Sequence, residues 1–496
     1  MAYKGSERMS IEERDYMQYL FGKHISQGQV TYLRTAHMDV YERNRKGATF
    51  TDAVSGKRFY DCFSSAGSFN CGRGNEAVID ALSDALDTYD MGSHLLLSEN
   101  KVRFAVKLAS LCPGDLNKVV LCATGSDACA AALKLAKGAT GRNDVINMLR
   151  GYHGLQGFSL SANGKDYYKE LFVPLMPGFH VVPINDLEAV RRVASRNIAA
   201  ILLEPTLGEG GIHPATQEYM NGLRQICDEH GIMLIFDEVQ TGFGRTGALW
   251  AMEQYGVIPD IMFTAKSAGG GVYVNGAVVY REIEPLVSYV EANPLFHTSH
   301  SGGTDLGCVV TGAVLDYIVE NKVWENVATA GRRFKEGLKQ IARENSDIVK
   351  EVRSFGLMIG IEYKYEFIAA IMSDCLVKQG LWAVYSANSP QVMRFQLTTA
   401  ISLEEVDEIL CGIRAAVKVM RRYLILLLPL AKVPMIRKLM ENVRLQIVTF
   451  NRVRDLEELI LRFTARRASP RRPSPLRAAF QRLRMFAGST PSIVRK

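Results

Sequence analysis

The chain has 496 residues, of which 47% are hydrophobic and 22% charged, so it is too long for one small module and too apolar for a disordered protein. Its 59 basic and 52 acidic residues give a formal charge of +7, but residues 421–496 alone hold 18 Lys and Arg against 4 Asp and Glu. Residues 1–420 are therefore mildly acidic, which argues against a nucleic-acid-binding surface there.

The targeting and redox signals point to the cytoplasm. Residues 1–10 are polar and lack the apolar core of a secretory signal, and the nine cysteines include no Cys-x-x-Cys pair. The longest strongly apolar run, residues 423–431, is less than half of the roughly 20 residues that span a bilayer. We expect reduced thiols, with no disulfide framework, metal site or transmembrane helix.

The first predicted elements are short strands. Residues 30–65 start irregularly, and residues 47–52 and 55–61 then alternate apolar and polar side chains around a Ser-Gly turn, which predicts an antiparallel hairpin. From about residue 75 to 320, apolar strands alternate with amphipathic helices, a pattern typical of a mostly parallel sheet covered on both faces. The strands are expected at residues 117–122, 198–203 and 232–236, and the helices from the first strand to residue 137 and at 217–230.

The C-terminal part predicts a smaller α/β domain. Its elements are helices at 324–344 and 367–379, strands at 356–362 and 392–397, and a last helix that starts at Leu403 behind the N-cap Ser402. Beyond residue 425 the chain is basic, Pro429 and Pro434 should break any helix, and residues 466–477 are too rich in Pro and Arg to pack. We expect four parts: an N-terminal segment of the small domain (1–65), a large domain (66–322), the small domain (323–425) and a basic extension (426–496).

Two strand ends carry the most informative residues. The apolar strand before Asp237 and Glu238 stops at these carboxylates and enters a glycine-rich loop. A second strand ends at Lys266, 29 residues after Asp237, and small residues follow. Ligands bind at the carboxyl ends of parallel strands, and a lysine desolvated there can act as an amine nucleophile. The alternative for an isolated lysine at a strand end is that its side chain only extends out of the core and takes no part in chemistry.

Two loops could bind a flat, phosphorylated molecule. Gly125 and Ser126 lie between a strand and an Ala-rich helix, where free backbone N–H groups and a hydroxyl suit a phosphate, although small residues also serve tight packing there. Tyr152 and His153 lie between glycines and suit stacking on a ring.

Together these elements resemble the class III aminotransferases, a family of pyridoxal-phosphate (PLP) enzymes. The resemblance covers about residues 25–420 and rests on Gly-Ser-Asp-Ala at 125–128, Tyr-His-Gly at 152–154, Glu-Pro-Thr-Leu-Gly-Glu-Gly-Gly at 204–211, the run from Asp237 to Gly247, and Lys266. It implies a fold-type I α/β protein, PLP as the cofactor and a homodimer with shared active sites.

The resemblance also implies a role for each matching residue. Lys266 would bind the cofactor covalently and move the substrate proton, while Asp237 would keep the ring nitrogen protonated. The other cofactor contacts would be Gly125 and Ser126 at the phosphate, Val239 and Tyr152 on the ring faces, Gln240 at the ring hydroxyl and His153 near the ring. That Asp237 and not Glu238 faces the ring follows from the family pattern alone.

The substrate contacts implied by the resemblance are Glu209 and Arg394. Glu209 would pair with Arg394 when an amine occupies the site and release it for an α-carboxylate. The alternative for Arg394 is a surface arginine in a salt bridge. In the loop at 297–308, His300 stands where the family carries a threonine that reaches the partner's phosphate, so His300, Ser301 or Thr298 would have to donate there.

The expected reaction moves an amino group from an amine or amino acid to a 2-oxo acid or carbonyl acceptor. Another PLP reaction, as in a racemase, an aminomutase or a decarboxylase, is the first alternative, and a binding or scaffold protein that kept the fold is the second. For the basic extension we consider packing on the small domain, an anionic membrane surface and a protein partner.

Overall fold

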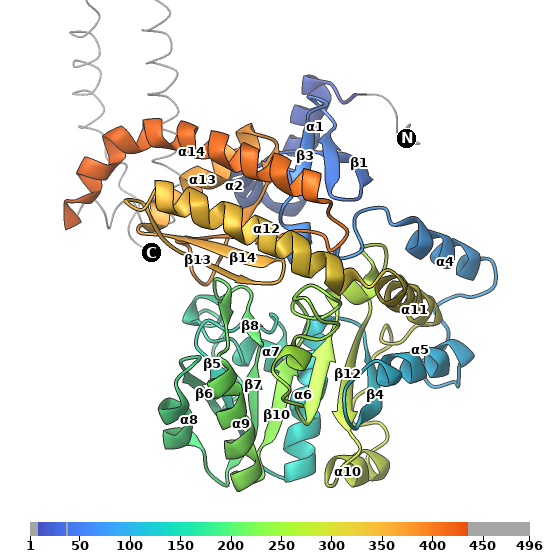
Figure 1. The fold of residues 1–496 in the computed structure, drawn as a ribbon. Helices are drawn as coiled ribbons and strands as arrows, with labels where there is room; N and C mark the ends of the chain where they lie inside the picture. The colour runs from blue at the N-terminus through green and yellow to red at the C-terminus, as the bar shows by residue number, and fades with distance from the viewer. Residues whose placement is uncertain (1–7, 36–37, 435–496) are drawn as a thin grey trace, which may run out of the picture. The chain divides into compact units, whose positions relative to one another are not determined.

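The structure, a computed structural model, describes residues 8–35 and 38–434, which are organised around three larger sheets (Figure 1). The basic extension beyond residue 434 lies outside the described residues. In the part of the chain that is described, no helix combines the length and the apolarity that a membrane span requires.

The N-terminal residues are helical before the first strand. They form α1 (Ile11–Phe21), η1 (Gly22–Ser26) and α2 (Gln27–Thr35), and the Ser10 hydroxyl caps α1 by accepting the N–H of Glu13 at 3.0 Å. The expectation of an irregular start at residue 30 was therefore wrong. α1 and η1 expose apolar side chains such as Ile11, Tyr16 and Ile25, so their sequence lacks the one-sided periodicity that signals a helix.

The predicted hairpin is present in the first sheet. β1 (Glu42–Lys46), β2 (Thr49–Asp52) and β3 (Arg58–Asp61) are antiparallel, which confirms the prediction for residues 47–61. β3 also pairs in parallel with β15 (Leu381–Trp382). The N-terminal segment is thus joined through its strands to residues from the C-terminal part of the chain.

A seven-stranded sheet forms the centre of the next region (Figure 1). Its order is β4 (Leu116–Cys122), β12 (Gly276–Arg281), β11 (Ile261–Thr264), β10 (Met233–Asp237), β7 (Ile198–Leu203), β5 (Asp144–Met148) and β6 (Phe179–Val182). Only β12 pairs in the antiparallel sense within this sheet, so the prediction of a mostly parallel sheet is confirmed.

Helices cover both faces of this sheet. Along β10, Leu234 and Phe236 enter one apolar core and Met233 and Ile235 enter the other, as the alternation of side chains on a strand requires. α9 (Gln217–His230) packs in the first core and α6 (Gly125–Thr140) in the second. The other elements of the region are α3 (Ser64–Gly67), α4 (Glu76–Leu86), α5 (Glu99–Ser110), α7 (Gly157–Ser161), η2 (Asp166–Tyr168), α8 (Leu187–Val193), β8 (Thr206–Leu207), β9 (His213–Pro214), η3 (Ala251–Gln254), η4 (Lys266–Gly269), α10 (Leu286–Ala292) and α11 (Asp305–Glu320).

The C-terminal part contains the third sheet and long helices (Figure 1). The sheet order is β13 (Val349–Phe355), β14 (Met358–Tyr363), β17 (Val392–Gln396) and β16 (Val384–Tyr385), and the helices are α12 (Val323–Glu344), α13 (Glu366–Lys378) and α14 (Leu403–Ala431). Ser402 and Glu405 cap α14 reciprocally, because each side chain accepts the other's backbone N–H, at 3.1 and 3.0 Å.

α14 continues through Pro429, so the expectation that this proline breaks the helix was wrong. Pro429 lies in the last turn, where its ring disturbs a single hydrogen bond near the end of the helix. Leu424 is buried, and the ammonium of Lys378 donates to the Tyr423 hydroxyl at 3.0 Å. The first residues of the apolar run at 423–431 therefore pack on the body of the protein.

Candidate active site

Three neighbouring strands bring Glu204, Asp237 and Lys266 to one edge of the large sheet. Leu203 pairs with Phe236, so Glu204 follows beside Asp237. Asp237 pairs with Phe263, three residues before Lys266. The carboxyl edge of a parallel sheet is where ligands bind, and here it holds two carboxylates and an amine.

Lys266 is held in an unusual conformation. It opens η4 with φ at 49°, and its ammonium has no hydrogen bond or ion pair with the residues the structure describes. Burial lowers the pKa of Lys266, while the carboxylates of Glu209, Asp237 and Glu204 raise it and Arg394 lowers it. A lysine with a lowered pKa has more of the neutral amine that can attack a carbonyl.

Asp237 is buried, and each of its two carboxylate oxygens has a partner. Its Oδ1 accepts the backbone N–H of Val239 at 3.0 Å, and its Oδ2 lies 2.8 Å from Nδ1 of His153. The second ring nitrogen of His153 is buried without a hydrogen-bond partner among the described residues. Asp237 is thus fixed in direction by one backbone group and one imidazole.

Glu238 serves a different purpose from its neighbour. Its carboxylate accepts the backbone N–H groups of Ala251 at 3.2 Å and Met252 at 3.0 Å, and it also bonds the Thr241 hydroxyl. Burial raises the pKa of Glu238 to about 7. Glu238 therefore holds η3 in place, whereas Asp237 faces the loop that carries His153.

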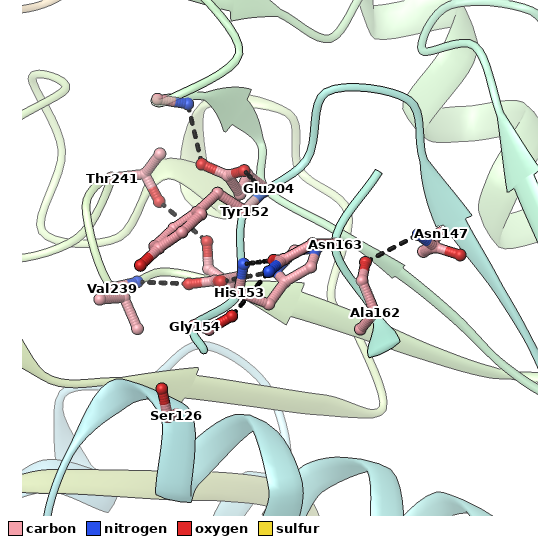
Figure 2. A network of polar contacts seen from close by, with 12 residues as sticks. Ser126, Asn147, Tyr152, His153, Gly154, Ala162, Asn163, Glu204, Val239 and Thr241 are labelled. Carbon is pink, nitrogen blue, oxygen red and sulfur yellow. Dashed lines mark hydrogen bonds and ion pairs between the residues drawn. The ribbon is translucent and has the colours of Figure 1, made fainter. Parts of the chain in front are cut away.

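Glu204 is a site residue that the sequence analysis quoted without a role. Its Oε1 accepts the N–H of Tyr152 at 3.0 Å and its Oε2 accepts the N–H of Gly208 at 2.8 Å (Figure 2). The pKa of Glu204 is raised to about 7, first by burial and then by nearby Asp237, while His153 acts to lower it. Its place one residue beyond the predicted strand 198–203 was the signal that could have identified it.

Asn163 is a second missed residue, and it shapes the Tyr152 loop. Its Oδ1 accepts the N–H of His153 at 2.8 Å, and its Nδ2 donates to the carbonyl of Gly154 at 2.7 Å (Figure 2). The loop is therefore tied to Glu204 at Tyr152 and to Asn163 at the next two residues. No motif in the sequence pointed to Asn163.

The turn at Gly125 and Ser126 starts the 16-residue helix α6. The Thr124 hydroxyl caps this helix, and the N–H groups of Gly125 and Ser126 have no acceptor among the described residues. A Cβ atom on Gly125 would lie 3.4 Å from a Val239 methyl group. The free N–H groups at this helix N-terminus suit an anion. The lack of a side chain at Gly125 lets Val239 lie close to the turn.

β17 contributes two side chains from one of its faces. Arg394 is only 2% exposed and its Nη1 lies 2.8 Å from Oε1 of Glu209, so the alternative of a surface arginine is excluded. Gln396, two residues later, donates to Oε1 of Gln240 at 2.8 Å. Gln396 was also missed as a site residue, although the two-residue period of a strand puts it beside Arg394.

His300 and Ser301 lie apart from these contacts. Both are exposed, the ring of His300 packs edge-on against His94 at 5.7 Å, and neither bonds Ser126 among the described residues. Nearby His297 approaches Asp127 at 3.1 Å.

His297 belongs to a small cluster that the sequence analysis overlooked. Cys122, Asp127 and His297 have ligand-type atoms within 4.8 Å of one another. The Lys134 ammonium lies 3.4 Å from Nδ1 of His297, so this ring nitrogen faces a donor. Because His297 is 170 residues from Asp127 in the sequence, no local spacing could reveal the cluster.

Comparisons with known proteins agree with one another. The sequence model described as Aminotransferase class-III matches residues 32–417. An uncharacterized aminotransferase from Archaeoglobus fulgidus is 38% identical over 389 residues, which cover 78% of this chain and 91% of that protein. The crystal structure of a thermostable (S)-enantioselective omega-transaminase from Thermomicrobium roseum superposes with a TM-score of 0.76 at 26% identity, covering 84% of this chain and 100% of the other. The ornithine aminotransferase from Toxoplasma gondii, whose active site holds PLP at partial occupancy, gives a TM-score of 0.73 at 24% identity. The match covers 82% of this chain and 99% of the other.

Proposed function

This chain belongs to the class III aminotransferases, which use PLP to transfer amino groups, and from that premise we propose which of its residues do so. The substrates are an amine or amino acid donor and a 2-oxo acid or carbonyl acceptor. We assign the covalent bond to the cofactor to Lys266. The observation that supports this most directly is an unpaired amine of lowered pKa beside Asp237 at the edge of the sheet.

The residues around Lys266 fit the cofactor. The free N–H groups of Gly125 and Ser126 suit its phosphate. Gly208 leaves room for Gln240, because a Cβ atom at Gly208 would lie 2.3 Å from the Gln240 amide oxygen. We therefore assign the phosphate to the start of α6 and the ring hydroxyl to Gln240.

Asp237 is assigned to the ring nitrogen, with His153 as its support. His153 Nδ1 at 2.8 Å and the Val239 N–H at 3.0 Å leave the carboxylate no freedom to rotate. Val239 and Tyr152 are assigned to the two ring faces. When bound, PLP takes up the electrons of the substrate carbon–hydrogen bond and carries the amino group between half-reactions. Lys266 removes and returns the proton at that carbon.

Glu209 and Arg394 are assigned to the substrate. Their 2.8 Å ion pair places an opposite charge beside a buried guanidinium, whose Nε and Nη1 have no hydrogen-bond partner among the described residues. An α-carboxylate that displaces Glu209 would take over the same guanidinium through charge-assisted hydrogen bonds. One pocket can thus accept a donor without a carboxylate and an acceptor that has one.

An absorbance titration tests the assignment. The purified protein should show the band of lysine-bound PLP, lose it on addition of an amine, and regain it on addition of a 2-oxo acid. Loss without recovery would point to a decarboxylase or another PLP reaction, and a racemase would leave amino and oxo acid pools unchanged. A protein that binds no PLP would contradict the proposal and support a scaffold role.

We further propose a homodimer in which His300 or Ser301 reaches the phosphate of the partner. Apolar side chains are exposed on α4, on α5, in the loop between them and just before His297: Leu86, Leu95, Leu96, Leu97, Val102, Val106 and Leu295. Burying such a surface in a second copy removes it from water.

Mixed dimers test the sharing of sites. A Lys266→Ala chain paired with a His300→Ala chain should regain one working site if His300 acts across the interface. The same mixture should stay inactive if His300 acts within its own chain. Sedimentation of the wild type checks the dimer itself, and a monomer that is fully active would contradict it.

The cytoplasm remains the proposed location. The division into segments 1–65, 66–322, 323–425 and 426–496 likewise remains a prediction, and α14 crosses its last boundary. For the basic extension, a peripheral contact with an anionic membrane or a protein is proposed on its charge alone.

A further inference from the structure

Two buried serines hold the backbone at the glutamate that we assign to the substrate. The Ser386 hydroxyl donates to the carbonyl of Glu209, and the Ser389 hydroxyl donates to the carbonyl of Gly210 at 2.8 Å. Both serines are buried, so bulk water does not compete for these bonds. Such a bond is costly to lose, because the carbonyl would remain without a partner.

Arg353 on β13 holds the next two carbonyls. Its Nη2 donates to the carbonyl of Gly211 at 2.8 Å, and its Nε donates to the carbonyl of Ile212 at 3.0 Å. The four consecutive carbonyls of residues 209–212 are therefore each bonded to a side chain from the C-terminal part. We call the three donors the carbonyl clamp: Ser386, Ser389 and Arg353.

The third sheet places Arg353 and Arg394 on the same face. Arg353 pairs with Gly360 of β14, and Gly360 pairs with Arg394 of β17, so the three residues form one row across the strands. Residues directly opposite each other in a sheet point to one side of it. A Cβ atom on Gly360 would lie 3.2 Å from the Cβ atom of Ile212, so the glycine lets residues 209–212 lie against this face.

One hairpin contacts Glu209 through both its backbone and its side chain. Ser386 and Ser389 lie in the loop between β16 and β17. The Ser386 N–H donates to the carbonyl of Val392, and the Val392 N–H donates to the carbonyl of Ser389, each at 2.8 Å. Arg394, two residues further, lies 2.8 Å from the Glu209 carboxylate. The same hairpin thus holds the Glu209 carbonyl and faces its carboxylate with an opposite charge.

We propose that the carbonyl clamp fixes the backbone of Glu209, so that its side chain alone moves when a substrate carboxylate displaces it from Arg394. Ser386 and Ser389 are then positioning residues that decide whether a donor without a carboxylate is accepted. Such a donor leaves the buried Arg394 without an opposite charge unless Glu209 is in place. A substrate with an α-carboxylate supplies that charge itself. This inference rests on the proposed function, because it uses the assignment of Glu209 and Arg394.

Alanine at either serine removes clamp bonds and leaves every side chain assigned to the cofactor or the substrate intact. Ser389→Ala is the milder change, because the Ser386 hydroxyl also accepts the Ser389 N–H at 3.0 Å. Ser373 on α13 is the matched control, since it is buried and its hydroxyl donates to the carbonyl of Ala383 at 3.2 Å. Ser373→Ala should lower Tm without changing the choice of donor.

The test compares benzylamine, which has no carboxylate, with L-alanine and pyruvate, which have one. The rate at which an amine removes the band of lysine-bound PLP, or pyruvate restores it, gives a specificity constant for one half-reaction. Ser386→Ala should lower the constant for benzylamine about three- to tenfold, and Ser389→Ala should lower it by a smaller factor. The constants for L-alanine and pyruvate should stay at or above the wild-type values. Both amines react with the same form of the enzyme, so a defect in cofactor binding would affect both.

Two kinds of failure are distinguishable. If the serine variants lower the constants for benzylamine and L-alanine equally, or leave their ratio unchanged, the clamp does not select donors, while the aminotransferase assignment stands. Ser389→Ala decides this alone if Ser386→Ala does not fold. A changed ratio in Ser373→Ala would also contradict the inference. If the wild type fails to react with one of the amines, or if Arg394→Ala lowers all three constants equally, the substrate assignment in the proposed function fails and this inference fails with it.

Discussion

The two sides of the active site are built in different ways. On the side that we propose for the cofactor, Asp237 and Glu204 each accept two hydrogen bonds and lie at strand ends whose register fixes their spacing. On the side that we propose for the substrate, Tyr152 and Tyr168 meet through a ring contact, and Glu209 and Arg394 come from separate elements joined by one ion pair. The first side depends on the register of the large sheet, whereas the second depends on contacts between separate elements.

The largest loss is expected from Lys266→Ala. This change removes the only amine at the edge described around Asp237, so the band of lysine-bound PLP and turnover should both disappear. Circular dichroism should show an unchanged fold, because the ammonium forms no bond in the described structure. Lys339→Ala, an exposed lysine on α12, is the control. Turnover in Lys266→Ala would assign the reaction to another residue.

The second-largest loss of activity is expected from Asp237→Asn, in which kcat should fall on the order of a hundredfold or more. An amide keeps the size of the side chain but cannot stabilise a protonated ring nitrogen. Glu238→Gln is the matched control, since Glu238 bonds backbone groups of η3. We expect that variant to lower Tm while changing kcat little. Equal losses of kcat in both variants would show that the two carboxylates do not differ in role.

Arg394→Ala should act on one half-reaction. A charge-assisted hydrogen bond contributes about 1.5–3 kcal/mol, so kcat/KM for a 2-oxo acid should fall about ten- to a hundredfold. Benzylamine has no carboxylate and should lose far less. Arg394→Lys keeps the charge without the planar guanidinium, so its kcat/KM for the 2-oxo acid should lie between the values of the wild type and Arg394→Ala. An equal loss for the amine and the acid would make Arg394 a structural residue.

Glu204 should make stability depend on pH. Its pKa is raised from 4.5 to about 7, mainly by burial, so the folded state binds the proton more tightly than the unfolded state. Its contribution to the free energy of unfolding is present below about pH 4.5 and is lost as the pH rises through about 7. Glu204→Gln cannot ionise, so the Tm difference between wild type and variant should shrink from pH 5 to pH 8. A constant difference would contradict the raised pKa.

The smallest effect on activity is expected from ending the chain after Pro434. α14 stays whole, because it ends at Ala431, whereas a cut at residue 425 would remove packed residues. Turnover should be unchanged. Binding to anionic vesicles, at low salt and not at high salt, should be seen for the full-length chain and lost in the shortened one. If neither chain sediments with vesicles, the membrane proposal fails.

Prediction from the sequence worked best where the signal is local. The helix at 217–230 and the strand at 198–203 have the predicted bounds, because apolar periodicity and an N-cap are set by neighbouring residues. It failed for α1 and η1, whose exposed apolar residues show no one-sided pattern. The prediction that Pro429 breaks the helix was wrong because the cost of a proline depends on how near it lies to the end of the helix.

The sequence by itself determined the family, the sheet and the residues that end its strands, because Asp237, Lys266 and the glycine-rich turns are contiguous motifs. Tertiary structure alone decided the surroundings of these residues. Only folding brings Asn163 to the His153 loop, Gln396 to Gln240, and Tyr32 to Tyr385, which is 353 residues away. Such contacts depend on the register of distant strands and on the packing of separate elements, which no local pattern of side chains encodes.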